Sequence, residues 1–164
     1  MSSFKAKQQA DYREGKHYEK LFCKLTGAEA GTAAEDRKHI DCHWKGFTVD
    51  VKGNKQSHKD GYALVEMKNV AGKDGWAVSG ADLIAFMFPS EFVVVKRTEL
   101  MVMAQKKVIA NNEDVKPVRA KGVTPEQGLY KVLGRNGRKD VFTYVTKDDL
   151  ERLTHVKVKI NELG

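Results

Sequence analysis

The sequence has few prolines and cysteines and no long apolar run. Of its 164 residues only 3 are proline and only 2, Cys23 and Cys42, are cysteine. So little cysteine excludes the disulfide framework of a small secreted domain, and a reduced compartment is expected. No run of about 18 apolar residues occurs, so neither a transmembrane helix nor a membrane partner is expected. The first residues lack the apolar core of a signal peptide, and we therefore expect a cytoplasmic protein.

Positive charge is abundant. The chain has 29 Lys and Arg against 22 Asp and Glu, a net charge of +7 and a pI near 9.3. Residues 115–164 hold 11 of these cations against 6 acidic residues. Such an excess favours a polyanionic partner such as nucleic acid, although a basic surface also serves solubility.

Apolar periodicity and turn residues predict the order of elements. Along the chain they are a helix over 8–26, a loop over 28–36, a hairpin over 38–52, a strand over 62–68, a buried hairpin over 82–96, a helix over 99–110 capped by Thr98, a loop over 111–127, a hairpin from 129 to 145, a helix over 147–153 capped by Thr146, and a strand over 155–160. This order predicts a single α/β domain built around a mixed sheet.

The hairpin at residues 39–53 contains the residues with the clearest chemistry. Lys45-Gly46 predicts a tight turn between its two strands. Asp41 belongs to the first strand, while Asp50 and Lys52 lie two apart on the second, so these two side chains share a face. Two carboxylates and an ammonium group brought together in this way could bind Mg²⁺ and act on a phosphodiester.

This pattern resembles the PD-(D/E)xK nuclease superfamily, in which an Asp precedes a strand with Asp/Glu-x-Lys. It is most similar to small phage endonucleases of the Holliday junction resolvase type, with Ile40 in place of the proline, Asp50 in place of the glutamate and Gly53 after the lysine. The resemblance spans about residues 10–100 and implies a restriction-endonuclease-like core, a mixed β-sheet flanked by helices. We expect one nuclease domain over 1–164, with its core at about 10–110 and a basic C-terminal extension at about 115–164.

The resemblance also implies an activity. It predicts a Mg²⁺-dependent DNA endonuclease, with Mn²⁺ able to substitute, that hydrolyses phosphodiester bonds and acts on branched or junction DNA. Resolvases are typically homodimers, because two strands must be cut symmetrically. A phage-encoded enzyme of this kind would work in the host cytoplasm.

The same resemblance assigns roles to residues. Asp41, Asp50 and the carbonyl of Val51 would be metal ligands, and Lys52 would be the catalytic lysine. Many members add a glutamate from the first helix, and Glu19 falls at that position, with Glu14 as the second choice. A solvated surface glutamate is the ordinary alternative for Glu19.

A second choice of catalytic motif, or register, remains possible. Glu66-Met67-Lys68 is another Asp/Glu-x-Lys on a predicted strand, and Asp50 precedes it by a spacing that some restriction enzymes use. In that register Asp50 and Glu66 are the ligands and Lys68 is the lysine. We prefer the first register because it uses a tight hairpin and has Gly53 after its lysine. Glu66 then supplies a further carboxylate to the site or pairs with a neighbouring lysine.

Further residues are candidates for contact with nucleic acid. Trp76, in a glycine-rich loop, could stack on an unpaired base, although a tryptophan packed in the core is commoner. The other candidates are cations in polar turns, which could contact the DNA backbone or be solvated, and they are Lys55, Lys73, Arg135, Arg138 and Lys139. His39, Cys42 and His43 do not have the spacing of a tetrahedral zinc site.

The alternative to an enzyme is a binding protein. A catalytically weak or inactive protein with the nuclease fold would act as a nucleic-acid-binding module, and an unrelated binding module with an accidental acidic cluster is a third hypothesis. Asp41, Asp50 and Lys52 are all present, which favours the enzyme.

Overall fold

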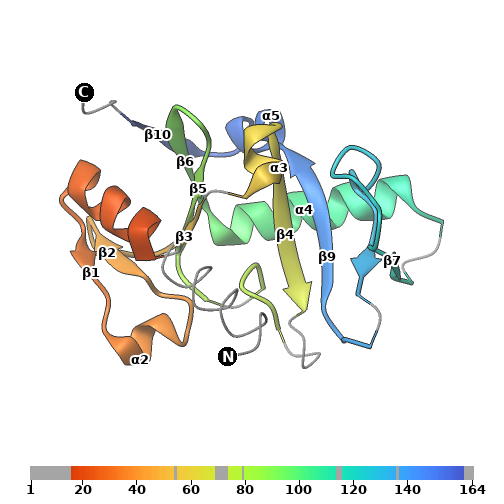
Figure 1. Ribbon diagram of the computed structural model, residues 1–164, viewed down its shortest axis with the longest axis horizontal. Helices are drawn as coiled ribbons and strands as arrows, with labels where there is room; N and C mark the ends of the chain where they lie inside the picture. The colour runs from red at the N-terminus through yellow and green to blue at the C-terminus, as the bar shows by residue number, and fades with distance from the viewer. Residues whose placement is uncertain are drawn as a thin grey trace, which may run out of the picture.

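The computed structural model describes residues 16–53, 55–68, 74–78, 80–113, 116–135 and 137–160. Within these residues the strands form two sheets, one with the order β1-β2-β3-β5-β6-β10 and one with the order β4-β9-β8-β7 (Figure 1). The α/β class is confirmed. The prediction of one mixed sheet is wrong, because the strand after the hairpin pairs elsewhere.

The first sheet contains both hairpins predicted in the N-terminal two thirds. Its strands are β1 (Glu29–Ala30), β2 (Cys42–Trp44), β3 (Phe47–Lys52), β5 (Leu83–Met87), β6 (Glu91–Lys96) and β10 (His155–Lys159). The β3–β5 pair is parallel and the other neighbours are antiparallel. A parallel pair needs a long crossover connection, and the chain between β3 and β5 supplies it.

The second sheet joins distant parts of the chain. Its strands are β4 (Tyr62–Lys68), β7 (Val118–Arg119), β8 (Leu133–Gly134) and β9 (Val141–Thr146). The strand predicted at 62–68 is confirmed, and it pairs antiparallel with β9 along its length. The predicted hairpin at 129–145 is present in reduced form, because β8 meets β9 only at Leu133↔Phe142. The predicted C-terminal extension at about 115–164 therefore contributes strands to both sheets: β10 to the first, and β7, β8 and β9 to the second.

Helices flank the sheets. Residues 16–26 are helical, and the other helices are α2 (Ala33–Asp36), α3 (Gln56–Lys59), α4 (Arg97–Asn111) and α5 (Lys147–Glu151). Residues 8–15 of the predicted first helix lie outside the described residues. Among the described helices none is long and apolar enough to cross a membrane.

The helix boundaries follow local capping chemistry. Thr146 caps α5 as predicted, with a capping box that it shares with Asp149. Thr98 does not cap α4, because β6 runs directly into the helix and Arg97 N–H donates to the Asp82 carbonyl. The loop predicted at 28–36 contains β1 and α2, where Thr32 forms a second capping box.

Two apolar clusters lie on opposite faces of the first sheet. Phe22, from the helix at 16–26, packs with Val49 and Val51 on one face. On the other face Phe86 packs with residues of α4 and of the second sheet. Because side chains alternate along β3, Asp50 faces away from the helix at 16–26 and toward the second sheet.

Candidate active site

The β2–β3 hairpin brings two carboxylates side by side. Its turn has Lys45 at φ 51° and Gly46 at φ 83°, the left-handed pair typical of a tight two-residue connection. Cys42 is opposite Val49 in the last pair of the β2–β3 ladder, and Asp41 and Asp50 are the next residue on each side of that pair. Asp41 N–H donates to the Val49 carbonyl at 2.8 Å, so Asp41 lies just outside β2 and out of the register of this ladder, with Asp41 and Cys42 both beside Val49. The tight turn predicted at Lys45-Gly46 is confirmed, and the hairpin places Asp41 beside the end of β3.

The two carboxylates differ in their partners. Asp41 Oδ2 accepts a hydrogen bond from Val51 N–H at 2.7 Å. Burial raises the pKa of Asp41, and the charges of Asp50 and Glu19 raise it further. Asp50 is only 2% exposed, and its buried Oδ2 has no hydrogen-bond partner among the described residues. A buried anion in this situation is costly unless another cation neutralises it.

Lys52 completes the cluster. Its Nζ lies 3.2 Å from Asp50 Oδ2. That contact is an ion pair by distance but lacks hydrogen-bond alignment, because the same oxygen is without a hydrogen-bond partner. The Nζ also lies 4.7 Å from the centre of the Trp76 ring, a cation–π distance. Lys52 is thus held between a carboxylate and an aromatic face.

Trp76 is a core residue. It is 4% exposed and meets Phe86 edge to face. The prediction that Trp76 contacts nucleic acid is therefore not supported, since a buried ring cannot stack on a base. Sequence could not reveal its contact with Lys52, because the two residues come from different elements.

The loop around Trp76 is fixed to the end of β4. Gly75 N–H donates to the Met67 carbonyl, and a Cβ at Gly75 would lie 2.7 Å from the Glu66 carbonyl oxygen. Arg97 holds the other end of the loop, with Nη1 2.6 Å from the Val78 carbonyl oxygen. The glycine and the arginine therefore fix the aromatic surface that supports Lys52.

Gly53, after the lysine, has a steric role. A Cβ there would lie 2.7 Å from the ring of Tyr18, which belongs to the helix at 16–26. Only a glycine lets this helix lie so close to the end of β3. The helix in turn carries Glu19 toward the hairpin.

Glu19 lies near Asp41, as predicted, and Asp36 joins them. One carboxylate oxygen from each of the three residues lies within 4.8 Å of the others. Lys16 Nζ lies 3.1 Å from Glu19 and 3.4 Å from Asp36, so a cation of the protein already balances this side of the cluster. Asp36 was missed because residues 28–36 were predicted to be a loop. The Thr32-x-x-Glu35 capping box is the signal that could have placed a helix end there.

The rival residues lie in the second sheet. Glu66 and Lys68 are on β4, and the register shifts between them where β4 pairs with β9. A bulge interrupts the alternation of side chains, so Glu-x-Lys at this position does not share a face as it does in a regular strand. Burial and the charge of Lys52 lower the pKa of Lys55, and the charge of Glu66 opposes that fall.

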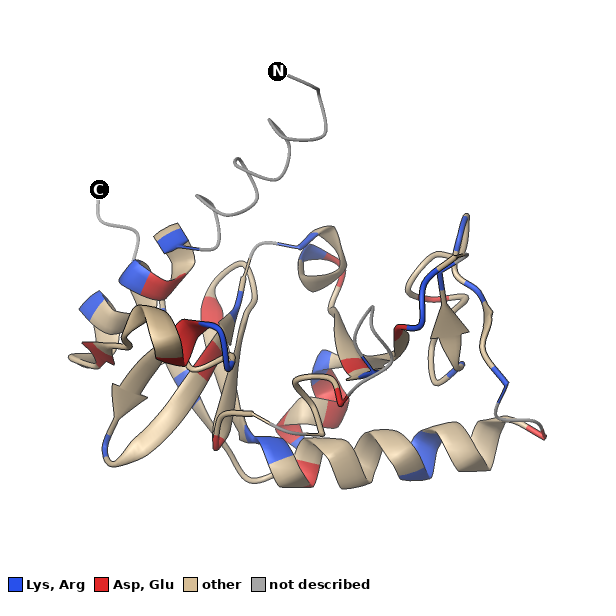
Figure 2. Cartoon of the chain, turned by 90° about the horizontal axis from the view of Figure 1, so that it is seen from below, with Lys and Arg blue, Asp and Glu red and all other residues tan. Residues whose placement is uncertain are grey.

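The predicted cationic contacts lie mainly in the second half of the molecule. Arg135, Arg138 and Lys139 are exposed in the β8–β9 connection, and Lys55 is exposed before α3. Lys73 lies outside the described residues. Figure 2 shows Lys and Arg in the segments beside β7, whereas the part of the molecule with the hairpin and the helix at 16–26 carries both acidic and basic residues.

The His and Cys residues of the hairpin have structural partners. Cys42 is fully buried in the cluster under the helix at 16–26, and burial raises the pKa of its thiol. His43 Nε2 lies 2.5 Å from Glu35 Oε2. Cysteine binds zinc as the thiolate, and the raised pKa of Cys42 opposes that form.

Comparison of the chain with family models, with curated proteins and with solved structures finds no match. Functional inference for this chain therefore depends on its own residues and their geometry.

Proposed function

We propose that the chain is a Mg²⁺-dependent DNA endonuclease that hydrolyses phosphodiester bonds at Asp41, Asp50 and Lys52. The observation that carries the proposal is the pairing of Asp41 with Asp50, next to a lysine that an aromatic ring supports. A fold rarely holds two carboxylates together unless a proton or a cation reduces their repulsion. Perturbed carboxylates of this kind gather at functional sites.

The donor set fits a hard divalent cation. Asp41 and Asp50 supply carboxylate oxygens, and the Val51 carbonyl could add another oxygen ligand. The buried Asp50 Oδ2 has Lys52 Nζ at 3.2 Å but no hydrogen-bond partner among the described residues, so it could still accept a ligand. Oxygen-only ligands suit Mg²⁺ or Mn²⁺ and disfavour softer ions. Glu19 lies beside Asp41 but outside the contacts of Asp50, and Lys16 balances part of its charge.

The chain's own residues would perform the remaining tasks. When bound, the cation polarises the scissile phosphate and lowers the pKa of an attacking water. The Lys52 ammonium would offset the negative charge that develops on the phosphate oxygens. Trp76 and Asp50 hold that ammonium from two sides, so little reorganisation is needed during reaction.

DNA is the proposed substrate because the net charge is +7 and cations gather beyond the acidic centre. Action on branched or junction DNA, a homodimer and a cytoplasmic location belong to the same proposal. The second candidate is a nucleic-acid-binding module with the same architecture, which the Lys52–Asp50 ion pair favours because it partly neutralises the site without a metal.

A cleavage assay tests the proposal. Plasmid and four-way-junction DNA are incubated with Mg²⁺, Mn²⁺ or EDTA, and wild type is compared with Asp50→Asn and Lys52→Met. We expect metal-dependent cutting by wild type and a loss of at least about 100-fold in both variants. Asp60→Asn, an exposed carboxylate at the end of α3, is the matched control and should cut like wild type. Tight binding of DNA by wild type without cutting would favour the binding module.

A further inference from the structure

A cationic hollow lies in the second sheet, apart from the carboxylates. It measures about 290 Å³ and is formed by β7 and by the connection between β8 and β9. Its charged lining consists of Arg119, Arg135, Arg138, Lys139 and Asp140. Four cations surround one carboxylate, so the hollow has a strong positive excess.

We propose that this hollow is a phosphate-binding subsite for the backbone of a nucleic-acid strand whose scissile phosphate lies at Asp50, with Lys55 as the cation between the two places. The inference rests on the proposed function and extends it to the path of the substrate across both sheets.

Asp140 gives the hollow a built-in anchor. It is 2% exposed, and its Oδ2 accepts a hydrogen bond from Arg135 Nε at 2.6 Å. Its Oδ1 is buried and has no hydrogen-bond partner among the described residues. The Arg135 side chain is 49% exposed. A guanidinium fixed through Nε still has its Nη donors for an incoming phosphate, and pre-ordering lowers the entropy cost of binding.

Lys55 connects the hollow with the carboxylates. Restricted hydration lowers its pKa, the positive charges of Lys52 and Arg135 lower it further, and Asp50 raises it. Lys55 is therefore within electrostatic reach of the candidate active site and of the hollow at once. It is nevertheless exposed at the surface, so a ligand can reach it. Neighbouring cations repel one another, and a bound polyanion relieves that repulsion.

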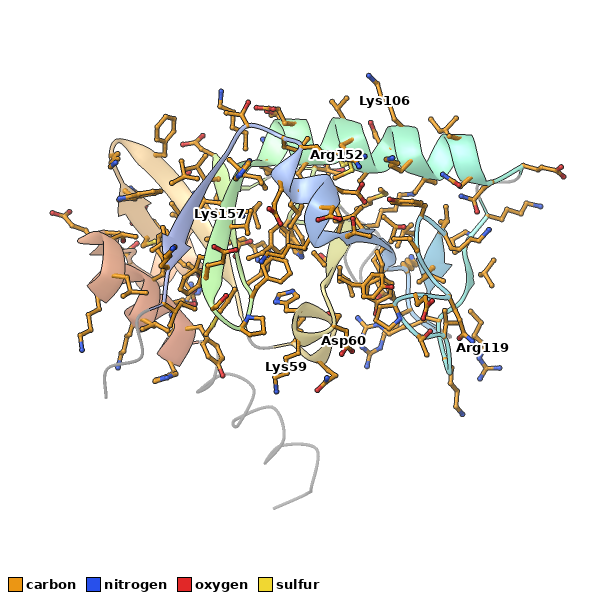
Figure 3. All side chains as sticks on the ribbon, turned by 90° about the horizontal axis from the view of Figure 1, so that it is seen from above. Lys59, Asp60, Lys106, Arg119, Arg152 and Lys157 are labelled. Carbon is orange, nitrogen blue, oxygen red and sulfur yellow. The ribbon has the colours of Figure 1, made fainter. Side chains whose placement is uncertain are left out.

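The arrangement favours a long polyanion. Figure 3 shows Arg119 on the same side of the molecule as Lys59 and Asp60 of α3, whereas Lys106 points away from the outer side of α4. Lys55 feels the charges of both Lys52 and Arg135, so these cations are near enough to act on one ligand. A free phosphate could occupy only one of these places, but a nucleic-acid backbone presents a charge at every nucleotide and can occupy them together.

The experiment separates binding from chemistry. Binding of a fluorescein-labelled 20-base-pair duplex is measured by anisotropy in EDTA at several salt concentrations, for wild type and for Arg135→Gln with Arg138→Gln. We expect the double variant to bind at least about 10-fold more weakly. The slope of the logarithm of its binding constant against the logarithm of salt concentration should be smaller in magnitude by about 2. Lys106→Gln, on the other side of the molecule, should match wild type. Circular dichroism melting checks that the double variant is folded.

Hydrolysis of bis(4-nitrophenyl) phosphate with Mn²⁺ supplies the second readout. This small diester cannot reach the hollow, so wild type and the double variant should hydrolyse it equally. If wild type cuts DNA while the affinity and salt slope of the folded double variant are unchanged, the subsite is refuted and the nuclease stands. If wild type binds DNA through these arginines but hydrolyses neither substrate, the subsite stands and the nuclease fails. Absence of DNA binding by wild type at low salt overturns both, and a loss of binding equal in Lys106→Gln refutes the subsite.

Discussion

Two aspartates, one at each sheet, are buried to the same extent but have different neighbours. Asp50 in the first sheet and Asp140 in the second are both 2% exposed, and each has a buried oxygen without a hydrogen-bond partner among the described residues. Asp140 has a well-formed contact with Arg135, at 2.6 Å. Asp50 has a second carboxylate, Asp41, beside it and only a poorly aligned ammonium. Burial alone therefore does not distinguish the two aspartates, whereas the neighbouring like charge of Asp41 does.

The largest expected effect comes from neutralising each aspartate. Asp50→Asn should lower DNA cleavage by at least about 100-fold without lowering the free energy of unfolding, because it removes repulsion from Asp41. Asp140→Asn should lower the free energy of unfolding by about 1–3 kcal/mol, because Arg135 loses its charged partner. The loss of cleavage is measured as the rate at saturating DNA. The change in the free energy of unfolding is measured by urea denaturation. Equal loss of stability in both variants would remove the contrast between the sheets.

The aromatic support of Lys52 has a smaller expected effect. Trp76→Leu should reduce kcat by about 10-fold through loss of the cation–π contact, and Trp76→Phe should reduce it less. The hairpin offers a matched control, since Lys45 Nζ lies 5.1 Å from the centre of the Trp44 ring. Trp44→Phe should leave kcat unchanged. A fall in KM alone, or the same kcat loss in Trp44→Phe, would contradict a positioning role for Trp76.

The raised pKa of Asp41 predicts a dependence of stability on pH. Because its folded pKa lies above its unfolded pKa, Asp41 binds its proton more tightly in the folded state, and its contribution to stability is lost as pH rises through the folded pKa. In EDTA the Tm of wild type should therefore fall more between pH 7 and 9 than that of Asp41→Asn. Mg²⁺ should reduce this difference. Parallel Tm profiles for the two proteins in EDTA would rule out the carboxylate repulsion.

The smallest effect on cleavage is expected from changing Glu66, the carboxylate of the alternative Glu66-x-Lys68 motif. Glu66→Gln should change cleavage by less than about 3-fold, because a bulge separates Glu66 from Lys68 and both lie in the second sheet. Asp41→Asn, compared in the same assay, should abolish cutting. Strong loss in Glu66→Gln together with normal cutting by Asp41→Asn would transfer the active site to the second register.

Local signals predicted the hairpin, and long-range pairing limited the rest. The Lys45-Gly46 turn and the alternation around Asp50 are properties of a short segment, so the sequence was enough to predict the hairpin that brings Asp41 near Asp50. The sheet to which Tyr62–Lys68 belongs depends on β9, far away in the chain, and apolar alternation does not identify a partner. Trp76 under Lys52 and Arg135 on Asp140 are likewise tertiary contacts without a sequence signature.

The central claim is that Asp41 and Asp50 hold a divalent cation. A crystal soaked with Mn²⁺ tests it directly, because the anomalous scattering of the metal gives its position independently of the protein. We expect a peak coordinated by oxygens of both Asp41 and Asp50 in wild type, and its loss in Asp50→Asn. A peak at Glu66 without these two residues, or no peak at Mn²⁺ concentrations that support cleavage, would contradict it.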